Sequence, residues 1–157
     1  MGKYIKIKTA AVVLTGLAWM SLHAAAQTCT PTTPDMLGPF YKEGAPVRSS
    51  VGAGYVLTGT VRSSADCNPV SNAKIEFWLV GPNGQYDDEH RATLYSGNNG
   101  EYKFESNIPK PYSGRPPHIH VMVMAEGFSH LITQHYPEEG VKSASWDLVL
   151  IPSAQKY

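Results

Sequence analysis

The stretch "AKIEFWLV", Ala73 to Val80, decides the fold class of this chain. Its apolar residues recur at every second position. Ile75, Phe77 and Leu79 would therefore leave one face of an extended strand, and the residues between them the other. An alternation of this kind is typical of a β-strand, whereas an amphipathic helix repeats its apolar residues every three to four positions. The segment therefore predicts a strand with one face in a core.

The sequence after residue 54 repeats this pattern in short runs broken by Gly, Pro, Asn and Asp. The runs are "YVLTGTVRS" (55–63), "LYSGNNGEYKFES" (94–106), "HIHVMVMA" (118–125), "SHLITQHY" (129–136) and "SWDLVLIP" (145–152). In the second run, Asn99-Gly100 predicts a β-hairpin, because glycine accepts the positive φ of a tight turn. No long stretch keeps a helical period. We therefore expect an all-β fold, an antiparallel β-sandwich.

Residues 1–26 have a different character from the rest of the chain. Three lysines precede an apolar run from Ala10 to Met20, and small residues end this segment at Ala26. The apolar run is short for a membrane span. The pattern predicts a signal peptide cleaved after Ala26, with an uncleaved anchor as the alternative, and thus export to the periplasm or the medium.

Composition limits the partners of the exported chain. The 157 residues include 13 basic and 13 acidic side chains; without residues 1–26, which hold three lysines and no acid, 131 residues remain with a net charge of −3. This is the size of one small domain. We expect an irregular N-terminal arm, 27–54, rich in Pro and Gly, and a sandwich domain, 55–157. Nucleic acid and membrane surfaces are excluded as partners, because both require a concentrated basic patch.

Two cysteines remain in the exported chain, Cys29 and Cys67. Thiols in an oxidising compartment tend to pair, so we predict a Cys29–Cys67 disulfide that fastens the arm to a turn. The alternative is a pair of metal-binding cysteines. It is less favoured because neither cysteine has a CxxC neighbour or a nearby histidine.

Two histidines begin the run "HIHVMVMA". His118 and His120 are separated by one residue, so in a strand both side chains leave the same face and could bind one metal ion. The pattern alone also fits two hydrogen-bonded histidines on a half-buried face.

The surroundings of these histidines extend the pattern. "RPPHIH" (115–120) follows a tyrosine at position 112 and belongs to a series of motifs in order and at similar spacing. The others are "TPDMLGPFY" (33–41), "IEFWLVGPNGQY" (75–86) and "LITQHY" (131–136). Together they resemble the intradiol ring-cleavage dioxygenases, the family of protocatechuate 3,4-dioxygenase and catechol 1,2-dioxygenase, over most of the exported chain.

The resemblance implies four protein ligands to a non-haem ferric ion, Fe(III): Tyr86, Tyr112, His118 and His120. The chemistry of the residue types agrees with this set. Phenolates are hard anionic donors that favour a higher oxidation state, whereas ferrous oxygenases typically use two histidines and a carboxylate. Two tyrosinates and one hydroxide would balance the charge of Fe(III).

The resemblance also implies a reaction and its participants. A small aromatic diol and O₂ would be the substrates, both oxygen atoms would enter a cis,cis-muconate-type diacid, and Tyr112 would be displaced by the substrate. Arg115 would stabilise negative charge during oxygen attack, because guanidinium stays protonated. Gln134 would contact substrate or metal-bound solvent. Phe40 and Tyr41 would lie at the mouth of the site.

Each of these residues also has a structural interpretation. Tyr86 and Tyr112 could be ordinary loop tyrosines, Arg115 could pair with Glu76 or Asp87, and Gln134 could only satisfy backbone groups. Three further histidines have no partner at ligand spacing and are expected to be structural or on the surface: His90, His130 and His135. We expect the "DDEH" run (87–90) to be a solvated loop, and Trp78 and Phe77 to serve packing.

Two other functions fit parts of the sequence. "LTGTV", "PVSNAKIEFW" and "GEYKF" equally suit a non-catalytic binding module, a transthyretin-like or carboxypeptidase-regulatory-like sandwich. A copper or zinc site on His118 and His120 alone is the third interpretation. The identity of the catechol and assembly into homo-oligomers stay open, although Arg48 or Arg91 could meet an acidic substituent.

Overall fold

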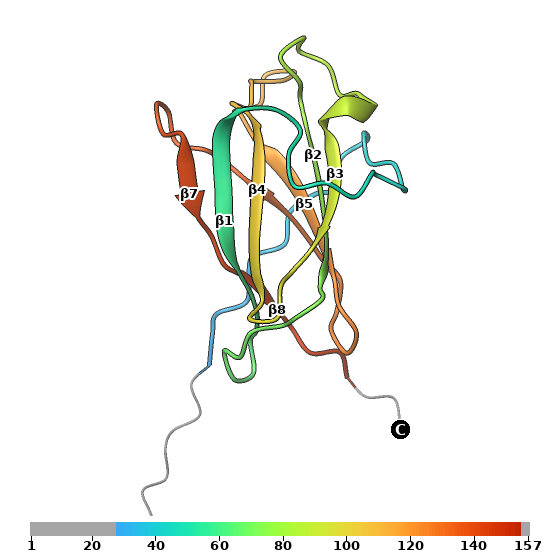
Figure 1. Cartoon of the computed structure of the whole chain (residues 1–157), viewed down its shortest axis with the longest axis vertical. Helices are drawn as coiled ribbons and strands as arrows, with labels where there is room; N and C mark the ends of the chain where they lie inside the picture. Colours follow the sequence, from blue (N-terminus) through green and yellow to red (C-terminus); the bar gives the residue numbers. More distant parts are fainter. Residues whose placement is uncertain (1–27, 155–157) are drawn as a thin grey trace, which may run out of the picture.

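Two four-stranded β-sheets lie face to face in the computed structural model, which describes residues 28–154 (Figure 1). The strands are β1 (Gly54–Ser63), β2 (Lys74–Leu79), β3 (Arg91–Tyr95), β4 (Glu101–Asn107), β5 (Ile119–Met124), β6 (Leu131–His135), β7 (Ser143–Ser145) and β8 (Leu148–Leu150). One 3₁₀ turn, η1 (Asp88–His90), precedes β3. The predicted all-β sandwich is confirmed, and the predicted signal peptide lies outside the described residues. Within the described part of the chain, no helix is long and apolar enough to cross a membrane.

The two sheets differ in how their strands run. One has the order β3-β2-β5-β6 and is antiparallel throughout. In the other, β1 pairs antiparallel with β4, but β7 and β8 both run parallel to β1. These short parallel pairs were not predicted. They arise because the chain leaves β6, crosses to the other sheet and then follows β1 in its own direction.

The predicted hairpin at Asn99-Gly100 is wrong, although the turn itself exists. Gly100 has a φ of +74° and its N–H donates to the carbonyl of Gly97 at 2.9 Å, as a tight turn requires. The flanking strands, however, belong to different sheets: β3 pairs with β2, and β4 pairs with β1. The turn therefore carries the chain across the sandwich instead of closing a hairpin.

The core lies between the sheets and follows the alternation of β2. Ile75, Phe77 and Leu79 are fully buried there, as predicted. The Phe77 ring stacks on Phe104 of the opposite sheet with centroids 4.2 Å apart. Burying side chains of this size contributes roughly 1.5–3 kcal/mol each relative to exposure, so this interface is a major source of stability.

The outer face of the β3-β2-β5-β6 sheet is also buried, because the arm covers it. Residues 28–53 contain no strand, which confirms the irregular arm. Asp35 to Tyr41 lie over this face, whereas Arg48 and Val51 donate backbone hydrogen bonds to β3 and β4. Tyr41 of the arm packs on Trp78 at 5.2 Å and donates a hydrogen bond to Glu76 at 2.9 Å. Both β2 residues are only 2% exposed. The arm therefore turns the outer face of this sheet into a second interior.

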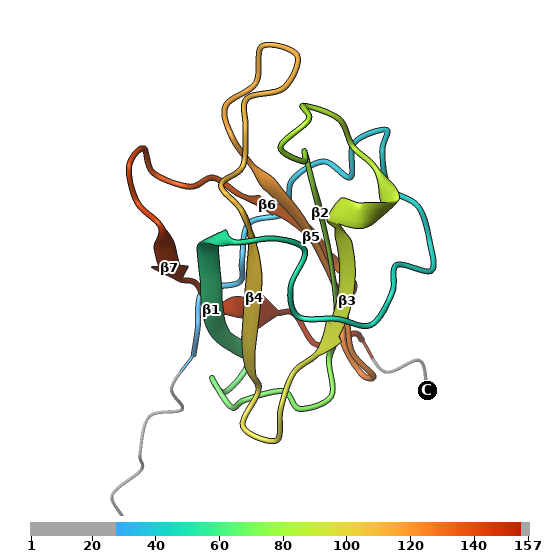
Figure 2. The ribbon, with the colours of Figure 1, turned by 45° about the horizontal axis from the view of Figure 1, so that its top comes forward.

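Three connections gather at one end of the sandwich, where Figure 2 shows the arm, the β2–β3 connection and the β4–β5 connection together. Ring contacts confirm the neighbourhood, since Phe40 of the arm touches Tyr86 and Tyr112 from the two connections. This end, beneath the arm, is where most of the sequence-predicted site residues meet.

Candidate functional site

A row of three side chains crosses the covered face of the sheet. Trp78 on β2 lies opposite His120 on β5, and His120 lies opposite Gln134 on β6. Their neighbours in sequence point into the core, so the alternation of each strand brings these three to one face. The indole of Trp78 stacks on the His120 ring, 4.9 Å away and nearly parallel, which fixes the ring and confirms a packing role for Trp78.

Tyr86 brings its hydroxyl to both histidines. Its Oη lies 2.9 Å from Nε2 of His118 and 3.2 Å from Nε2 of His120. Neighbouring ligands of an octahedral ion with bonds near 2.1 Å are about 3 Å apart. One oxygen and two nitrogens from β5 and the β2–β3 connection therefore converge on one point, although the three residues span 34 positions of the sequence.

Burial holds all three groups neutral. It lowers the pKa of His118 and lowers that of His120 to about 4, and for His120 the nearby His118 and Arg115 lower it further. Burial also raises the pKa of Tyr86 to about 12. His118 Nδ1 lies 2.8 Å from the carbonyl oxygen of Pro116. If Nδ1–H donates to this acceptor, Nε2 presents a lone pair toward Tyr86, as a metal ligand requires.

Tyr112 lies beside this group, on the β4–β5 connection. Its ring is 5.2 Å from that of Tyr86, at a steep angle, and 5.4 Å from that of Phe40. Phe40 in turn stacks on Tyr86 at 4.3 Å. The structure thus brings Tyr112 next to Tyr86, which contacts both histidines, and Phe40 to the same place. Tyr112 is more exposed than the two histidines.

Arg115 exchanges backbone hydrogen bonds with Tyr112, and its side chain pairs with neither Glu76 nor Asp87. Its Nη2 donates to Gln134 Oε1 at 2.8 Å and to the hydroxyl of Tyr136 at 2.8 Å. Gln134 Nε2 donates to the carbonyl of Met36 in the arm at 2.7 Å, so this side chain does satisfy a backbone group as well. Gln134 therefore connects Arg115 to the arm.

Known proteins are similar to this chain in sequence and in fold, although no family model matches it. Hydroxyquinol 1,2-dioxygenase of Nocardioides simplex is 36% identical, over 68% of this chain and 47% of its own length. Chlorocatechol 1,2-dioxygenase of Pseudomonas sp. strain P51 is 30% identical, over 73% and 59%. The solved dioxygenase domain of a dioxygenase carbohydrate-binding protein fusion from Streptomyces sp. SirexAA-E has a TM-score of 0.69 at 26% identity, over 79% of this chain and 100% of that one. The chain belongs to the intradiol ring-cleavage dioxygenase family.

This intradiol dioxygenase family member spans about half the length of the curated relatives it matches. The expected family resemblance is confirmed.

The side chains of this dioxygenase-family site fit a ferric ion. In residues 28–154, no group of three or more His, Cys, Asp or Glu side chains could hold a metal ion. A metal on His118 and His120 would find the phenol oxygen of Tyr86 within 3.2 Å of both Nε2 atoms, and the ring of Tyr112 beside it. Two imidazoles and two hard phenolate oxygens suit Fe(III) better than a soft or divalent ion. The charge of such an ion can ionise a buried phenol that is otherwise neutral.

Two site residues were missed from the sequence, although both lie in the quoted motifs. Tyr136 ends "LITQHY", and Asp35 stands in "TPDMLGPFY". The Tyr136 hydroxyl donates to Asp35 Oδ2 at 2.8 Å while it accepts from Arg115. A tyrosine two residues after Gln134 points to the same face of a strand, and this spacing could have identified it.

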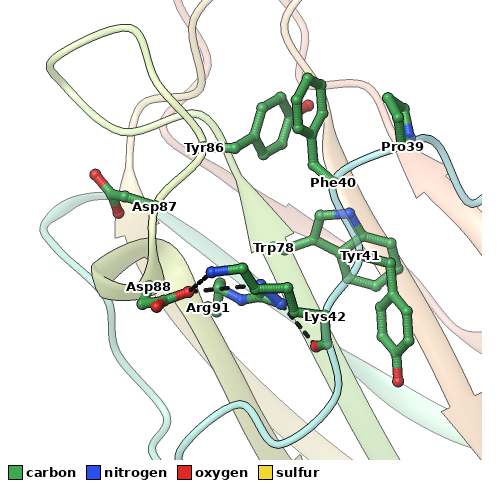
Figure 3. Close-up of a pocket in the computed structure, with 9 residues that line it drawn as sticks. All are labelled: Pro39, Phe40, Tyr41, Lys42, Trp78, Tyr86, Asp87, Asp88 and Arg91. Carbon is green, nitrogen blue, oxygen red and sulfur yellow. Dashed lines mark hydrogen bonds and ion pairs between the residues drawn. The ribbon is translucent and has the colours of Figure 1, made fainter.

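A cavity of about 140 Å³ lies beside Tyr86 (Figure 3). Its walls include the ring of Trp78 and the cations Lys42 and Arg91. Asp88 lies 2.8 Å from Lys42 Nζ and 3.7 Å from Arg91 Nη1. An acidic substituent in this cavity would therefore compete with a carboxylate that is already present.

Arg48, the other cation considered for an acidic substituent, faces away from the site. Its guanidinium donates to the backbone carbonyls of Asp88 and Glu89 in η1 and of Arg91 at the start of β3. Arg48 thus fastens the arm to η1, and we withdraw it as a substrate contact.

The remaining histidines are structural or exposed, as expected, but the "DDEH" run is not a plain solvated loop. Asp87 caps η1 by accepting two backbone N–H groups of the turn, and its Oδ1 lies 2.6 Å from Nδ1 of the buried His90. His135 lies 2.6 Å from the hydroxyl of Tyr55 beneath the site. His130 is exposed.

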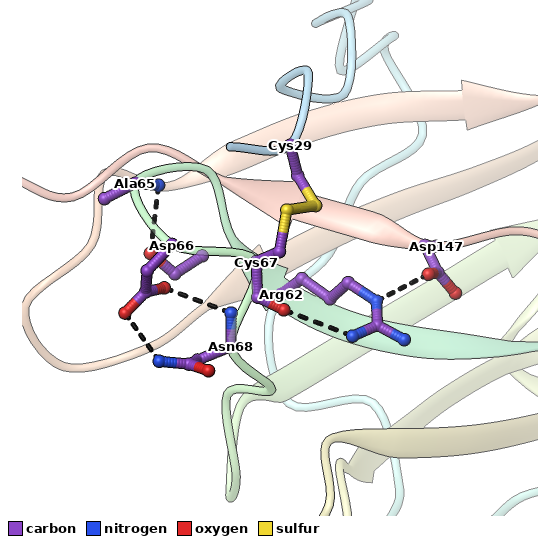
Figure 4. Close-up of a disulfide and its surroundings, with 8 residues drawn as sticks. Cys29, Arg62, Ala65, Asp66, Cys67, Asn68 and Asp147 are labelled. Atoms are coloured by element: carbon purple, nitrogen blue, oxygen red, sulfur yellow. Dashed lines mark hydrogen bonds and ion pairs between the residues drawn. A yellow bond between two sulfur atoms is a disulfide. The ribbon is translucent and has the colours of Figure 1, made fainter. Parts of the chain in front are cut away.

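The predicted disulfide ties down the beginning of the arm. Cys29 is bonded to Cys67 in the turn after β1 (Figure 4). Arg62 of β1 donates to the Cys67 carbonyl at 3.1 Å and to Asp147 Oδ2 at 2.7 Å. The arm is therefore anchored to the sandwich six residues before Asp35.

Proposed function

We propose that this protein catalyses intradiol cleavage of a catechol-type ring by O₂, with a non-haem ferric ion held by Tyr86, Tyr112, His118 and His120. The observation that carries the proposal is the approach of the Tyr86 hydroxyl to both Nε2 atoms, 2.9 and 3.2 Å away. The named relatives, which are 1,2-dioxygenases of hydroxyquinol and chlorocatechol, support it.

Each residue has a distinct task in this proposal. A bound ferric ion supplies a Lewis-acidic centre for the two catechol oxygens and makes the ring reactive toward O₂. His118 and His120, neutral and buried, are permanent ligands. Tyr112, the more exposed phenol, would be the ligand that a substrate oxygen replaces, and its Oη would then hold a proton from the catechol. Tyr86 stays bound, with Phe40 stacked on its ring.

Arg115 contributes fixed positive charge beside the reacting ring. Its guanidinium is held by Gln134 and Tyr136, so it needs little reorganisation when negative charge develops on the substrate. Groups placed in this way stabilise a transition state more than mobile groups do, because their orientation is fixed before reaction.

The alternative functions account for less of the site. A transthyretin-like or carboxypeptidase-regulatory-like module uses the same sandwich but gives no reason for two phenols to meet two imidazoles. A copper or zinc site on His118 and His120 alone leaves the Tyr86 contacts without a role. We further propose that the protein is exported, because the Cys29–Cys67 disulfide suits an oxidising compartment.

The test is iron loading followed by substrate. Iron-loaded protein should be wine-red from tyrosinate-to-iron charge transfer, should change colour with catechol under nitrogen, and should consume one O₂ per ring when air is admitted. Catechol, hydroxyquinol, chlorocatechol and protocatechuate, compared at equal concentration, would identify the preferred ring. A protein that binds iron without colour, or binds zinc and no iron, would contradict the proposed ligand set.

A further inference from the structure

Four side chains form a connected chain of hydrogen bonds beside the proposed metal centre. Arg115 Nη2 donates to both Gln134 Oε1 and Tyr136 Oη, each at 2.8 Å. The hydroxyl of Tyr136 lies 2.8 Å from Asp35 Oδ2 and 3.0 Å from Gln134 Oε1. The arm thus reaches the guanidinium of Arg115 twice, through Asp35 and through the Met36 carbonyl that holds Gln134.

The directions of these bonds follow from the groups. A phenol has one proton, and the carboxylate of Asp35 is a stronger acceptor than the amide oxygen, which already accepts from Arg115. With its proton directed to Asp35, the Tyr136 oxygen offers a lone pair to Arg115. A carboxylate on one side and a guanidinium on the other therefore fix the orientation of the phenol between them.

The pKa shifts of Asp35 and Tyr136 agree with these hydrogen-bond directions. Burial opposes ionisation of Asp35, but the Met36 N–H, Tyr136 and Arg115 together lower its pKa. Burial raises the pKa of Tyr136 most, and the hydrogen bond and negative charge of Asp35 raise it further. This phenol therefore stays protonated and can donate. Asp35 is 101 residues from Tyr136 in sequence, so the contact depends on how the arm is placed.

We propose that Tyr136 and Asp35 are positioning residues that hold the Arg115 guanidinium toward the substrate. This inference rests on the proposed function, and neither residue needs to touch the substrate. It assigns the beginning of the arm a task in turnover: Asp35 orients Tyr136, and Tyr136 orients Arg115. Loss of either residue should slow the chemical step and leave substrate binding nearly unchanged.

A double-mutant cycle tests the dependence on Arg115. Tyr136→Phe removes the hydroxyl and keeps the ring, and we expect kcat to fall about tenfold with little change in KM, because a transition-state interaction is weakened. In Arg115→Ala the same substitution should have no further effect, since Tyr136 acts through Arg115. Multiplicative losses in the double variant would overturn the proposal. Tyr95→Phe, an exposed tyrosine on β3, is the matched control and should retain full kcat.

Asp35 is tested by graded replacement. Asp35→Ala removes the acceptor and should lower kcat about as much as Tyr136→Phe, whereas Asp35→Asn keeps an amide oxygen that still accepts from the phenol and should restore part of the loss. Equal kcat in all three proteins would refute a role for Asp35.

A second measurement separates this proposal from the proposed function. In the full chain before iron loading, nitrogen-15 NMR of the arginine guanidinium groups should show restricted Nη hydrogens for Arg115, identified by their loss in Arg115→Ala. In Tyr136→Phe the guanidinium should rotate more freely, so that these signals average. Unchanged signals would refute the positioning role. Absence of ring cleavage with every catechol would instead refute the proposed function, and the NMR result would still decide the positioning.

Discussion

Two imidazoles and a phenol meet in the site with their ionisation shifted in opposite senses. Burial lowers the pKa of both histidines and raises that of Tyr86, so each group is uncharged where it lies. A phenol oxygen that lies 2.9 and 3.2 Å from two neutral imidazole nitrogens gains most from a shared cation, which would bind the lone pairs and ionise the phenol.

Removal of a permanent ligand should abolish iron binding. His120→Ala loses one of four ligands and the stacking on Trp78, so we expect iron affinity to fall by more than about 100-fold, beyond the loss typical of outer-shell changes. Iron content and visible absorbance measure this directly. His130→Ala, at an exposed position, is the control. Stoichiometric red iron in the His120 variant would exclude this histidine as a ligand.

Removal of the displaceable ligand should have a different result. Tyr112→Phe leaves three ligands, so we expect iron to remain bound with altered colour and kcat to fall at least about tenfold, because the proton acceptor at this position is lost. Rapid mixing with catechol under nitrogen reports the binding step separately. If the variant turns over like the wild type, Tyr112 has no part in the reaction.

His135 gives a prediction for stability against pH. Burial lowers its pKa to about 4, against about 6.5 in an unfolded chain. Between these values the unfolded chain binds a proton that the folded chain does not. The free energy of unfolding is therefore complete above about pH 6.5 and falls as the pH decreases toward 4.

Urea unfolding of iron-free protein at several pH values measures this effect. His135→Gln should flatten the decline, whereas His130→Gln at an exposed position should leave the decline as in the wild type. A decline of the same slope in all three proteins would show that His135 does not contribute.

Residue types in order along the chain were enough to predict which side chains gather at the site. We could predict Tyr86, Tyr112, Arg115 and the two histidines because they stand in motifs that resemble those of a known family. Asp35 and Tyr136 were not predicted, since their roles depend on one contact across 101 residues. The local spacing places Tyr136 on the same face as Gln134, but it carries no information about the contact with Asp35.

Among the elements, the arm determines how closed the site is. Gly38 has a φ of +74°, and a Cβ added there would lie 3.0 Å from Cε1 of His120. The arm can therefore pass over the histidine only with glycine at this position. Such an approach limits the freedom of the His120 ring at its Cε1 edge.

Gly38→Ala should weaken iron binding, because the new methyl group pushes on His120. We expect iron affinity to fall roughly tenfold and the free energy of unfolding to fall by about 1 kcal/mol from the positive φ. Gly44→Ala is a matched control: its φ is +77° and nothing lies within 4 Å of an added Cβ. It should lose similar stability and no iron affinity. Equal iron affinity in both variants would show that the contact with His120 is unimportant.

The alternation of apolar residues predicted the strands well and their pairing less well. The strand "AKIEFWLV" lies where expected, with its apolar face in the core. The pattern could not show that β3 and β4 belong to different sheets, because both pairings bury the same faces. It also missed that Glu76 would be buried, since the arm that covers it has no periodicity of its own.

On the scale of the whole molecule, the disulfide closes a loop of 38 residues that begins in the arm. The chain-entropy model gives roughly 3–4 kcal/mol for a loop of this length. Cys29→Ser/Cys67→Ser should therefore lower Tm by about 10 °C or more.

Thermal unfolding with and without reductant tests this stabilisation. Reductant should lower the Tm of the wild type toward that of the double variant and leave the double variant unchanged. Two thiols that react in the native protein, or equal Tm values, would contradict a stabilising bridge.

The contacts of the arm with Gln134 and Tyr136 also have a consequence for the order of events in the cell. Asp35 and Met36 emerge early from the ribosome, but their partners Gln134 and Tyr136 are made about 100 residues later. A nascent chain that has exposed all four proposed iron ligands still lacks the segments that fasten the arm over them. We therefore expect iron to bind after the polypeptide is released from the ribosome. A chain that ends before Gln134 should be inactive.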